Sequence, residues 1–225
     1  MKTLKFGLIG LLLIVSSLLP LGCGGSDSDL PVQTIDFKSD GNGFIQYYTN
    51  DSSKLDKGIY DTTNTNQTPM KTLETQVKKI SGKPRWGYGV IFCFQDTDNF
   101  YRLLIHENGR YQIAKKVGGK YLEPLIKSWT DSSALYTGYN VVNTIKVTYV
   151  PDYSFNIYFN GTLATTFTDN DVTKFSGGDY GFYVSVGKDE NFPNNPVDVR
   201  FKQITPAFSI TNNNLKSIIT EKLHN

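Results

Sequence analysis

The chain has 225 residues, of which 39% are hydrophobic and 13% aromatic, and its formal net charge at pH 7 is +2. With 14 Phe and 14 Tyr to fill a core, it is not a disordered chain, and with two Cys it is not a disulfide scaffold. The balanced charge also excludes nucleic-acid binding driven by a bulk positive field.

The first 22 residues are predicted to be an export signal. Lys2 and Lys5 precede a nearly unbroken apolar run over residues 6–19. A helix of that length rises about 21 Å, which is short of the roughly 30 Å hydrocarbon core of a bilayer. Residues 1–22 therefore read as a signal peptide, and the small polar residues of 23–33 read as a flexible tether.

The end of this segment resembles the lipobox of bacterial lipoprotein precursors. The matching residues are Leu19-Pro20-Leu21-Gly22-Cys23. The resemblance implies that Cys23 becomes a lipid-bearing N-terminus, which would anchor the protein to a membrane of the cell envelope. Gly24 after the Cys implies the outer membrane if the host is Gram-negative. The alternative is a plain secretory signal with an incidental Cys.

From Thr34 onward the dominant hydrophobic period is two, which is typical of strands with one core face and one wetter face. The alternating runs are 73–78, 101–106, 145–149, 155–160, 180–186 and 197–202. Their spacing predicts one all-β domain over residues 34–208, an antiparallel β-sandwich. Residues 49–69 are expected to be a surface loop with one short strand near 58–60. Residues 209–225 are expected to be a tail, with a short C-terminal helix over 211–223.

Residues 86–94 differ because both alternating faces are apolar, which predicts a central strand that is covered on both sides. Gly87 and Gly89 within it indicate a close approach by another chain segment. Cys93 in the same run is expected to be a buried, inert thiol. Asn108-Gly109 and Asn160-Gly161 predict two hairpins with type I′ turns.

The segment from Trp86 to Phe201 resembles the concanavalin A-like lectin/glucanase superfamily, particularly laminin-G-like domains. The pieces that carry the resemblance are, in order, 87–92, 98–103, 109–113, 143–147, 157–161, 178–184 and 197–201. The resemblance implies a jelly-roll sandwich with one concave face. It implies no single activity, because this fold is used by lectins, hydrolases and adhesive modules.

Catalytic patterns are largely missing from the sequence. Glycoside hydrolysis needs two carboxyl groups, and no Glu has an acidic partner two residues away. Asp96 and Asp98 are two positions apart, so they point to the same side, and they lie between two expected strands. Their carboxylates either cap backbone N–H groups of a turn or supply two ligands of a Ca²⁺ site. His106 and Glu107 are expected at a solvated hairpin tip. No other cofactor is indicated.

The alternate positions of the strands that do not face the core predict a binding face. These positions carry Arg102, His106, Tyr158 and Tyr183. Sugar rings stack on aromatic side chains, and Trp129, in a polar stretch, would be an exposed anchor. Alternatively these are ordinary outward tyrosines, and Trp129 packs beneath a loop.

The sequence favours a lipid-anchored, non-catalytic sandwich that binds carbohydrate or a surface protein. A glycan-acting hydrolase of the same fold and a purely structural envelope protein remain the alternatives.

Overall fold

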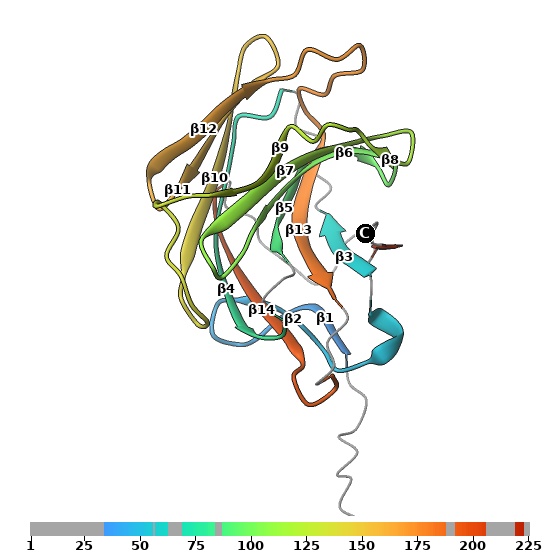
Figure 1. The fold of residues 1–225 in the computed structure, drawn as a ribbon, viewed down its shortest axis with the longest axis vertical. Helices are drawn as coiled ribbons and strands as arrows, with labels where there is room; N and C mark the ends of the chain where they lie inside the picture. The colour runs from blue at the N-terminus through green and yellow to red at the C-terminus, as the bar shows by residue number, and fades with distance from the viewer. Residues whose placement is uncertain are drawn as a thin grey trace, which may run out of the picture.

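A computed structural model describes residues 34–55, 57–62, 69–83, 87–187, 192–205 and 219–222. Figure 1 shows two facing sheets, and every strand pairing within them is antiparallel. Across the first sheet the order is β1 (Thr34–Ser39), β2 (Ile45–Thr49), β14 (Val197–Thr205), β4 (Thr72–Ser81), β10 (Asn143–Val150), β11 (Ser154–Phe159) and β12 (Thr162–Thr168).

Across the second sheet the order is β15 (Ile219–Lys222), β3 (Lys57–Thr62), β13 (Asp179–Val186), β5 (Tyr88–Asp96), β6 (Asn99–Ile105), β7 (Arg110–Val117) and β8 (Lys120–Tyr121). A further strand, β9 (Lys127–Asp131), also pairs with β7, and one 3-10 turn, η1 (Ser52–Lys54), precedes β3. The predicted all-β antiparallel sandwich is confirmed, and so is the short strand expected near residues 58–60.

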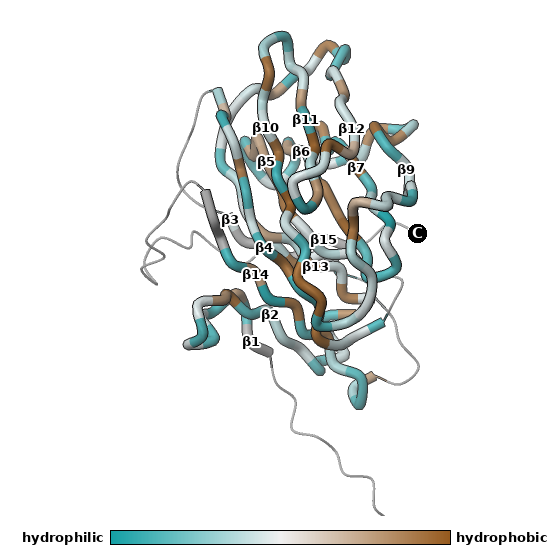
Figure 2. Tube along the Cα trace, turned by 90° about the vertical axis from the view of Figure 1, so that its left-hand side faces the viewer, coloured by the Kyte–Doolittle hydropathy of each residue, from teal (hydrophilic) through white to brown (hydrophobic). Residues whose placement is uncertain are grey.

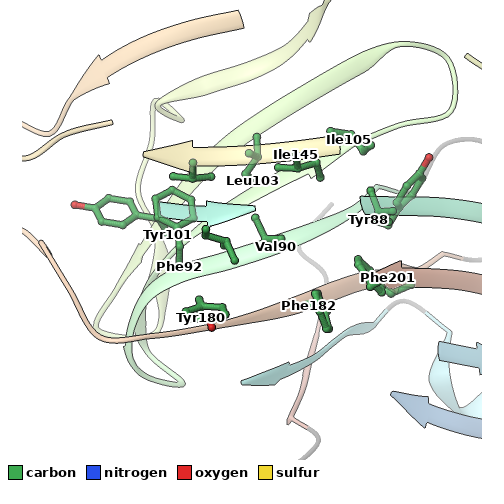
Figure 3. Packing of buried hydrophobic residues seen from close by; sticks show 14 of the residues in the cluster. Tyr88, Val90, Phe92, Tyr101, Leu103, Ile105, Ile145, Tyr180, Phe182 and Phe201 are labelled. Atoms are coloured by element: carbon green, nitrogen blue, oxygen red, sulfur yellow. The ribbon is translucent and has the colours of Figure 1, made fainter. Parts of the chain in front are cut away.

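The core lies between the two sheets, where the apolar side chains on the inner faces of the strands pack against one another (Figure 3). Phe92 of β5 stacks on Tyr101 of β6 at 5.3 Å between ring centroids and meets Phe155 of β11 edge-on at 5.4 Å. At the other end, Phe182 of β13 stacks on Phe201 of β14 at 4.5 Å. Hydropathy alternates along the strands, as Figure 2 shows, because successive side chains point to opposite faces of a sheet.

Strand β5 is buried on both faces over residues 88–94, as predicted. A Cβ on Gly89 would lie 2.2 Å from the carbonyl oxygen of Leu103 on β6, so the close approach expected at this glycine is present. The expectation for Cys93 is also met, since its thiol is buried and burial raises its pKa, which keeps it protonated.

Both Asn-Gly hairpins form, but only one has the expected turn. Asn160 and Gly161 both have positive φ, 51° and 83°, as a type I′ turn requires. In the other turn only Gly109 has positive φ, and its N–H donates to the carbonyl of His106 at 3.0 Å. The type I′ prediction is wrong there, because a three-residue loop closes on a left-handed glycine instead.

The helix expected over 211–223 is wrong where the structure describes that segment. Ile219–Lys222 forms β15, which pairs with residues 57–60 of β3. The helix-like apolar spacing is overridden because pairing satisfies the backbone groups along the outer edge of β3. Residues 1–33, with the predicted signal, tether and Cys23, lie outside the described residues. Within the described ranges, no helix is long and apolar enough to cross a bilayer.

Candidate binding face on the second sheet

The outer face of the second sheet carries a row of aromatic and polar side chains between small ones. In the strand register, Tyr60 of β3 lies opposite Tyr183 of β13, which lies opposite Gly89 of β5. The row continues through Leu104 of β6 to Gln112 of β7. Arg102 is two residues from Leu104 along β6, so it projects from the same face on the next row.

Arg102 is the centre of a group of five side chains on this face, which we call the Arg102 cluster. Its Nη1 donates hydrogen bonds to the hydroxyls of Tyr121 and Tyr183, both at 2.9 Å, and its Nη2 donates to Gln112 Oε1 at 3.2 Å. The guanidinium carbon lies 4.3 Å and 4.9 Å from the centroids of the same two tyrosine rings. Tyr183 in turn stacks on Tyr60 at 5.9 Å and 13°. The result is a continuous series of cation–π and ring contacts between side chains from β3, β13, β6 and β8.

The inner members of this cluster do not face open solvent. Tyr183 is 0% exposed and Arg102 is 9% exposed, and His106, outside the cluster but on the same face, is also buried. Four half-buried side chains on β7, β8 and β9 border these buried residues. We call them the rim, and they are Arg110, Gln112, Tyr121 and Trp129. The buried residues therefore position the rim, and the rim is the part of this face that a ligand can reach.

Trp129 is held at one end of the rim. A Cβ on Gly87 would lie 2.8 Å from its Cη2 atom, so the absence of a side chain at Gly87 makes room for the indole. Its ring meets His106 edge-on at 5.6 Å, and its carbonyl accepts a hydrogen bond from Arg110 Nη2 at 2.8 Å. The indole thus packs on the outer face of the second sheet, where Leu104 also lies under it.

The hairpin tip that holds His106 and Glu107 is not solvated, contrary to expectation. Both side chains are buried, because the segment after β9 folds over them and Gly138 donates its N–H to the carbonyl of Glu107. Glu107 Oε2 lies 3.3 Å from Lys79 Nζ, and its Oε1 lies 3.8 Å from His106 Nδ1. Burial raises the pKa of Glu107, and the charge of Lys79 opposes that shift.

Tyr158 is separated from the other predicted ligand-binding residues. It lies on β11 in the first sheet, where Lys146 Nζ stands 5.7 Å from its ring centroid. Arg102, Tyr183 and Trp129 lie on strands of the second sheet, and His106 directly follows β6 and packs against Trp129. The structure therefore brings together four of the five and places Tyr158 elsewhere.

Asp96 is the last residue of β5, and Asp98 lies in the turn between β5 and β6. The Asp96 carboxylate accepts hydrogen bonds from the Asp98 N–H at 2.8 Å and from Asn99 Nδ2 at 2.8 and 3.0 Å. That is the turn-capping arrangement. Within the described ranges, no group of three or more His, Cys, Asp or Glu side chains is placed to hold a metal ion. Ca²⁺ binding here stays a prediction.

No protein-family model matches the chain, and no curated protein matches it. Among solved structures, it is similar to the carbohydrate-binding module CBM66 from Bacillus subtilis, with 17% identity and a TM-score of 0.46 over 76% of this chain and 88% of that one. It is also similar to the receptor-binding domain of botulinum neurotoxin type G, with 18% identity and a TM-score of 0.39 over 80% of this chain and 40% of that one. Sheep galectin-11 gives 11% identity and a TM-score of 0.36 over 72% and 96%. Likenesses this distant carry no argument about what the chain binds.

Proposed function

We propose that the protein binds carbohydrate along the rim of the second sheet and performs no catalysis. The observation that carries this proposal is the Arg102 cluster, which fixes the Tyr121 ring beside the Gln112 amide. Saccharides combine apolar C–H faces with many hydroxyls. A binding site for them therefore needs ordered aromatic surfaces next to directional hydrogen-bond groups. A rim that is already held in place loses little conformational entropy when a ligand binds.

The non-catalytic part of the proposal is supported by where the acids lie. Glycosidases place two carboxyl groups on either side of the scissile bond, about 5–10 Å apart. None of the four rim side chains is an acid, and Asp131 beside them pairs with Arg110 at 3.5 Å. Glu107 has the raised pKa expected of a general acid, but it is buried under the segment after β9 and paired with Lys79.

The binding test uses a saccharide array followed by titration calorimetry with the best ligand. Trp129→Ala and Tyr121→Ala should each weaken binding by at least about tenfold, since aromatic anchors dominate binding energy at such surfaces. The matched control is Tyr158→Ala, which removes a partly buried tyrosine from the first sheet and should leave affinity unchanged.

Three outcomes would contradict the proposal. They are no saccharide binding by the unmodified protein, loss of binding only in Tyr158→Ala, and release of new reducing ends from the bound glycan. The first would turn the search toward a surface-protein partner, and the last toward a hydrolase.

Lipid anchoring at Cys23 in the cell envelope is proposed on the sequence motif alone. Replacing the acylated thiol removes the attachment point for acyl chains, each buried CH₂ of which contributes about 0.8 kcal/mol to membrane binding. Cys23→Ser should therefore move the protein from the membrane fraction to the soluble fraction of the producing cells, while Cys93→Ser should not. Membrane association that survives Cys23→Ser would contradict the anchor.

A further inference from the structure

A buried lysine meets two carboxylates at the edge of the sandwich where β7 of the second sheet faces the segment after β12 of the first. Lys115 Nζ lies 2.6 Å from Asp169 Oδ2, and these two side chains are 1% and 3% exposed. Asp171 Oδ2 lies 3.1 Å from the same nitrogen, and the carbonyl of Thr173 accepts a hydrogen bond from it. We call Lys115, Asp169 and Asp171, with the rings around them, the Lys115 cluster.

Two aromatic rings also lie beside this nitrogen. The ring centroids of Tyr101 and Phe175 lie 5.8 Å and 5.6 Å from Lys115 Nζ. The Tyr101 hydroxyl donates a hydrogen bond to Asp169 Oδ2, the same oxygen that contacts the lysine, and accepts one from the Phe175 N–H at 3.3 Å. The backbone N–H of Asp171 donates to the other oxygen, Asp169 Oδ1, at 3.0 Å.

An ion pair alone is one explanation, but burying two charges in such a site costs several kcal/mol of hydration per ion. The cluster also has what amide formation needs. The amine nitrogen lies 2.6 Å from one oxygen of the carboxyl group, so the fold already holds the two reacting groups side by side. A phenol donates to one carboxyl oxygen, and a second carboxylate contacts the nitrogen and can move its protons.

We propose that Lys115 and Asp169 become joined by an intramolecular isopeptide bond. Lys115 Nζ gives a proton to Asp171 and attacks Cγ of Asp169. Oδ2, held by Tyr101, becomes the amide oxygen. The Cγ–Oδ1 bond breaks, and Oδ1 leaves as water with two of the three ammonium protons, relayed through Asp171. The ammonium and the carboxylate thus become one amide and one water, with no oxidant, reductant or cofactor.

The bond would tie the two sheets together covalently at an edge where the other contacts described are non-covalent. Lys115 is on β7 of the second sheet, and Asp169 directly follows β12, an edge strand of the first sheet. The two residues are 54 positions apart in sequence. The link would therefore close a loop that contains strands β8 to β12.

The decisive experiment is a tryptic digest of the denatured full-length protein followed by tandem mass spectrometry. An acylated Lys115 cannot be cleaved by trypsin, so residues 111–116 should be recovered joined to residues 147–174, one water lighter than the two peptides together. Lys79 with Glu107 is an internal control, because that buried pair is longer, at 3.3 Å, and is expected to be unlinked. Recovery of only the separate linear peptides overturns the proposal.

Two variants test the chemistry. Lys115→Met should abolish the branched peptide, and the wild-type digest keeps the proposal testable even if this variant folds poorly. Asp171 is 55% exposed, so Asp171→Asn should fold normally but slow link formation by roughly a hundredfold, as loss of a proton-transfer group does. Its thermal unfolding midpoint, measured before the link forms, checks the fold. An unchanged rate in Asp171→Asn would overturn the role of that carboxylate.

Discussion

Phe155→Ala should lower the free energy of unfolding by about 3–5 kcal/mol, the usual cost of emptying a large buried aromatic site. The Phe155 ring, fully buried on β11, lies 5.2 Å from Tyr101 and 5.4 Å from Phe92 on the second sheet. On its own sheet it stacks on Phe167 at 5.1 Å. The substitution leaves a cavity bounded by both sheets, and rigid strands can collapse into it only in part. Equilibrium unfolding in guanidinium chloride measures the loss.

Leu163→Ala is the matched control for this substitution. Leu163 also lies in the first sheet, on β12, but its side chain is 52% exposed. Its removal should change the free energy of unfolding by less than about 0.5 kcal/mol, as surface substitutions usually do. If both variants lost the same amount, the inter-sheet packing described for Phe155 would be contradicted.

The strands were predictable because their signal is local. Alternating apolar residues identify each strand and its core face, and this parity correctly assigned Arg102 and Tyr183 to the outward side. The alternation gives the face of the sheet from which a side chain projects, but it does not predict whether another segment buries that side chain. Arg102 is buried because Tyr121 folds against it from β8, a two-residue strand too short to show any period. Counting the hairpin register through the Gly118-Gly119 turn would have placed Tyr121 opposite Lys116.

Contacts between distant segments account for the other differences. Nothing near His106 and Glu107 in sequence indicates that they are buried, because the segment that covers them connects β9 to β10. In that segment, the backbone N–H groups of Gly138 and Asn140 donate hydrogen bonds to the carbonyls of Glu107 and Lys79. The Lys115 cluster is likewise assembled from residues 54 positions apart. Such pairings have no periodic signature, since they depend on how two complete sheets are laid over each other.

Lys79→Met should cost about 3–5 kcal/mol of unfolding free energy at neutral pH, because it removes the counter-charge of a buried carboxylate. Lys79 and Glu107 are both buried, and Nζ lies 3.3 Å from Oε2. Methionine keeps most of the side-chain volume, but it removes the ammonium group and its contact with the Tyr88 ring, whose centroid lies 5.8 Å from Nζ. The loss is therefore chiefly electrostatic, which chemical denaturation of both proteins under matched conditions measures.

The size of this loss should depend on pH in a definite direction. Burial already raises the pKa of Glu107 above its ordinary value of 4.5, and Lys79 opposes that shift. Without Lys79 the pKa rises further, so the folded variant binds the proton more tightly than the unfolded chain does. Such a group stabilises the fold at low pH, and its contribution is lost as pH rises from 4.5 through the folded-state pKa.

The difference in stability between wild type and Lys79→Met should accordingly shrink as the pH is lowered from neutrality toward 4.5, the ordinary carboxyl value. The double variant Lys79→Met, Glu107→Gln is the control. The double variant has no carboxylate at this position. Its free energy of unfolding relative to wild type should therefore lack the extra decrease toward neutral pH that an unpaired, charged Glu107 causes. A loss for Lys79→Met that is constant with pH, or that grows on acidification, would show that the ion pair does not hold Glu107 in its charged form.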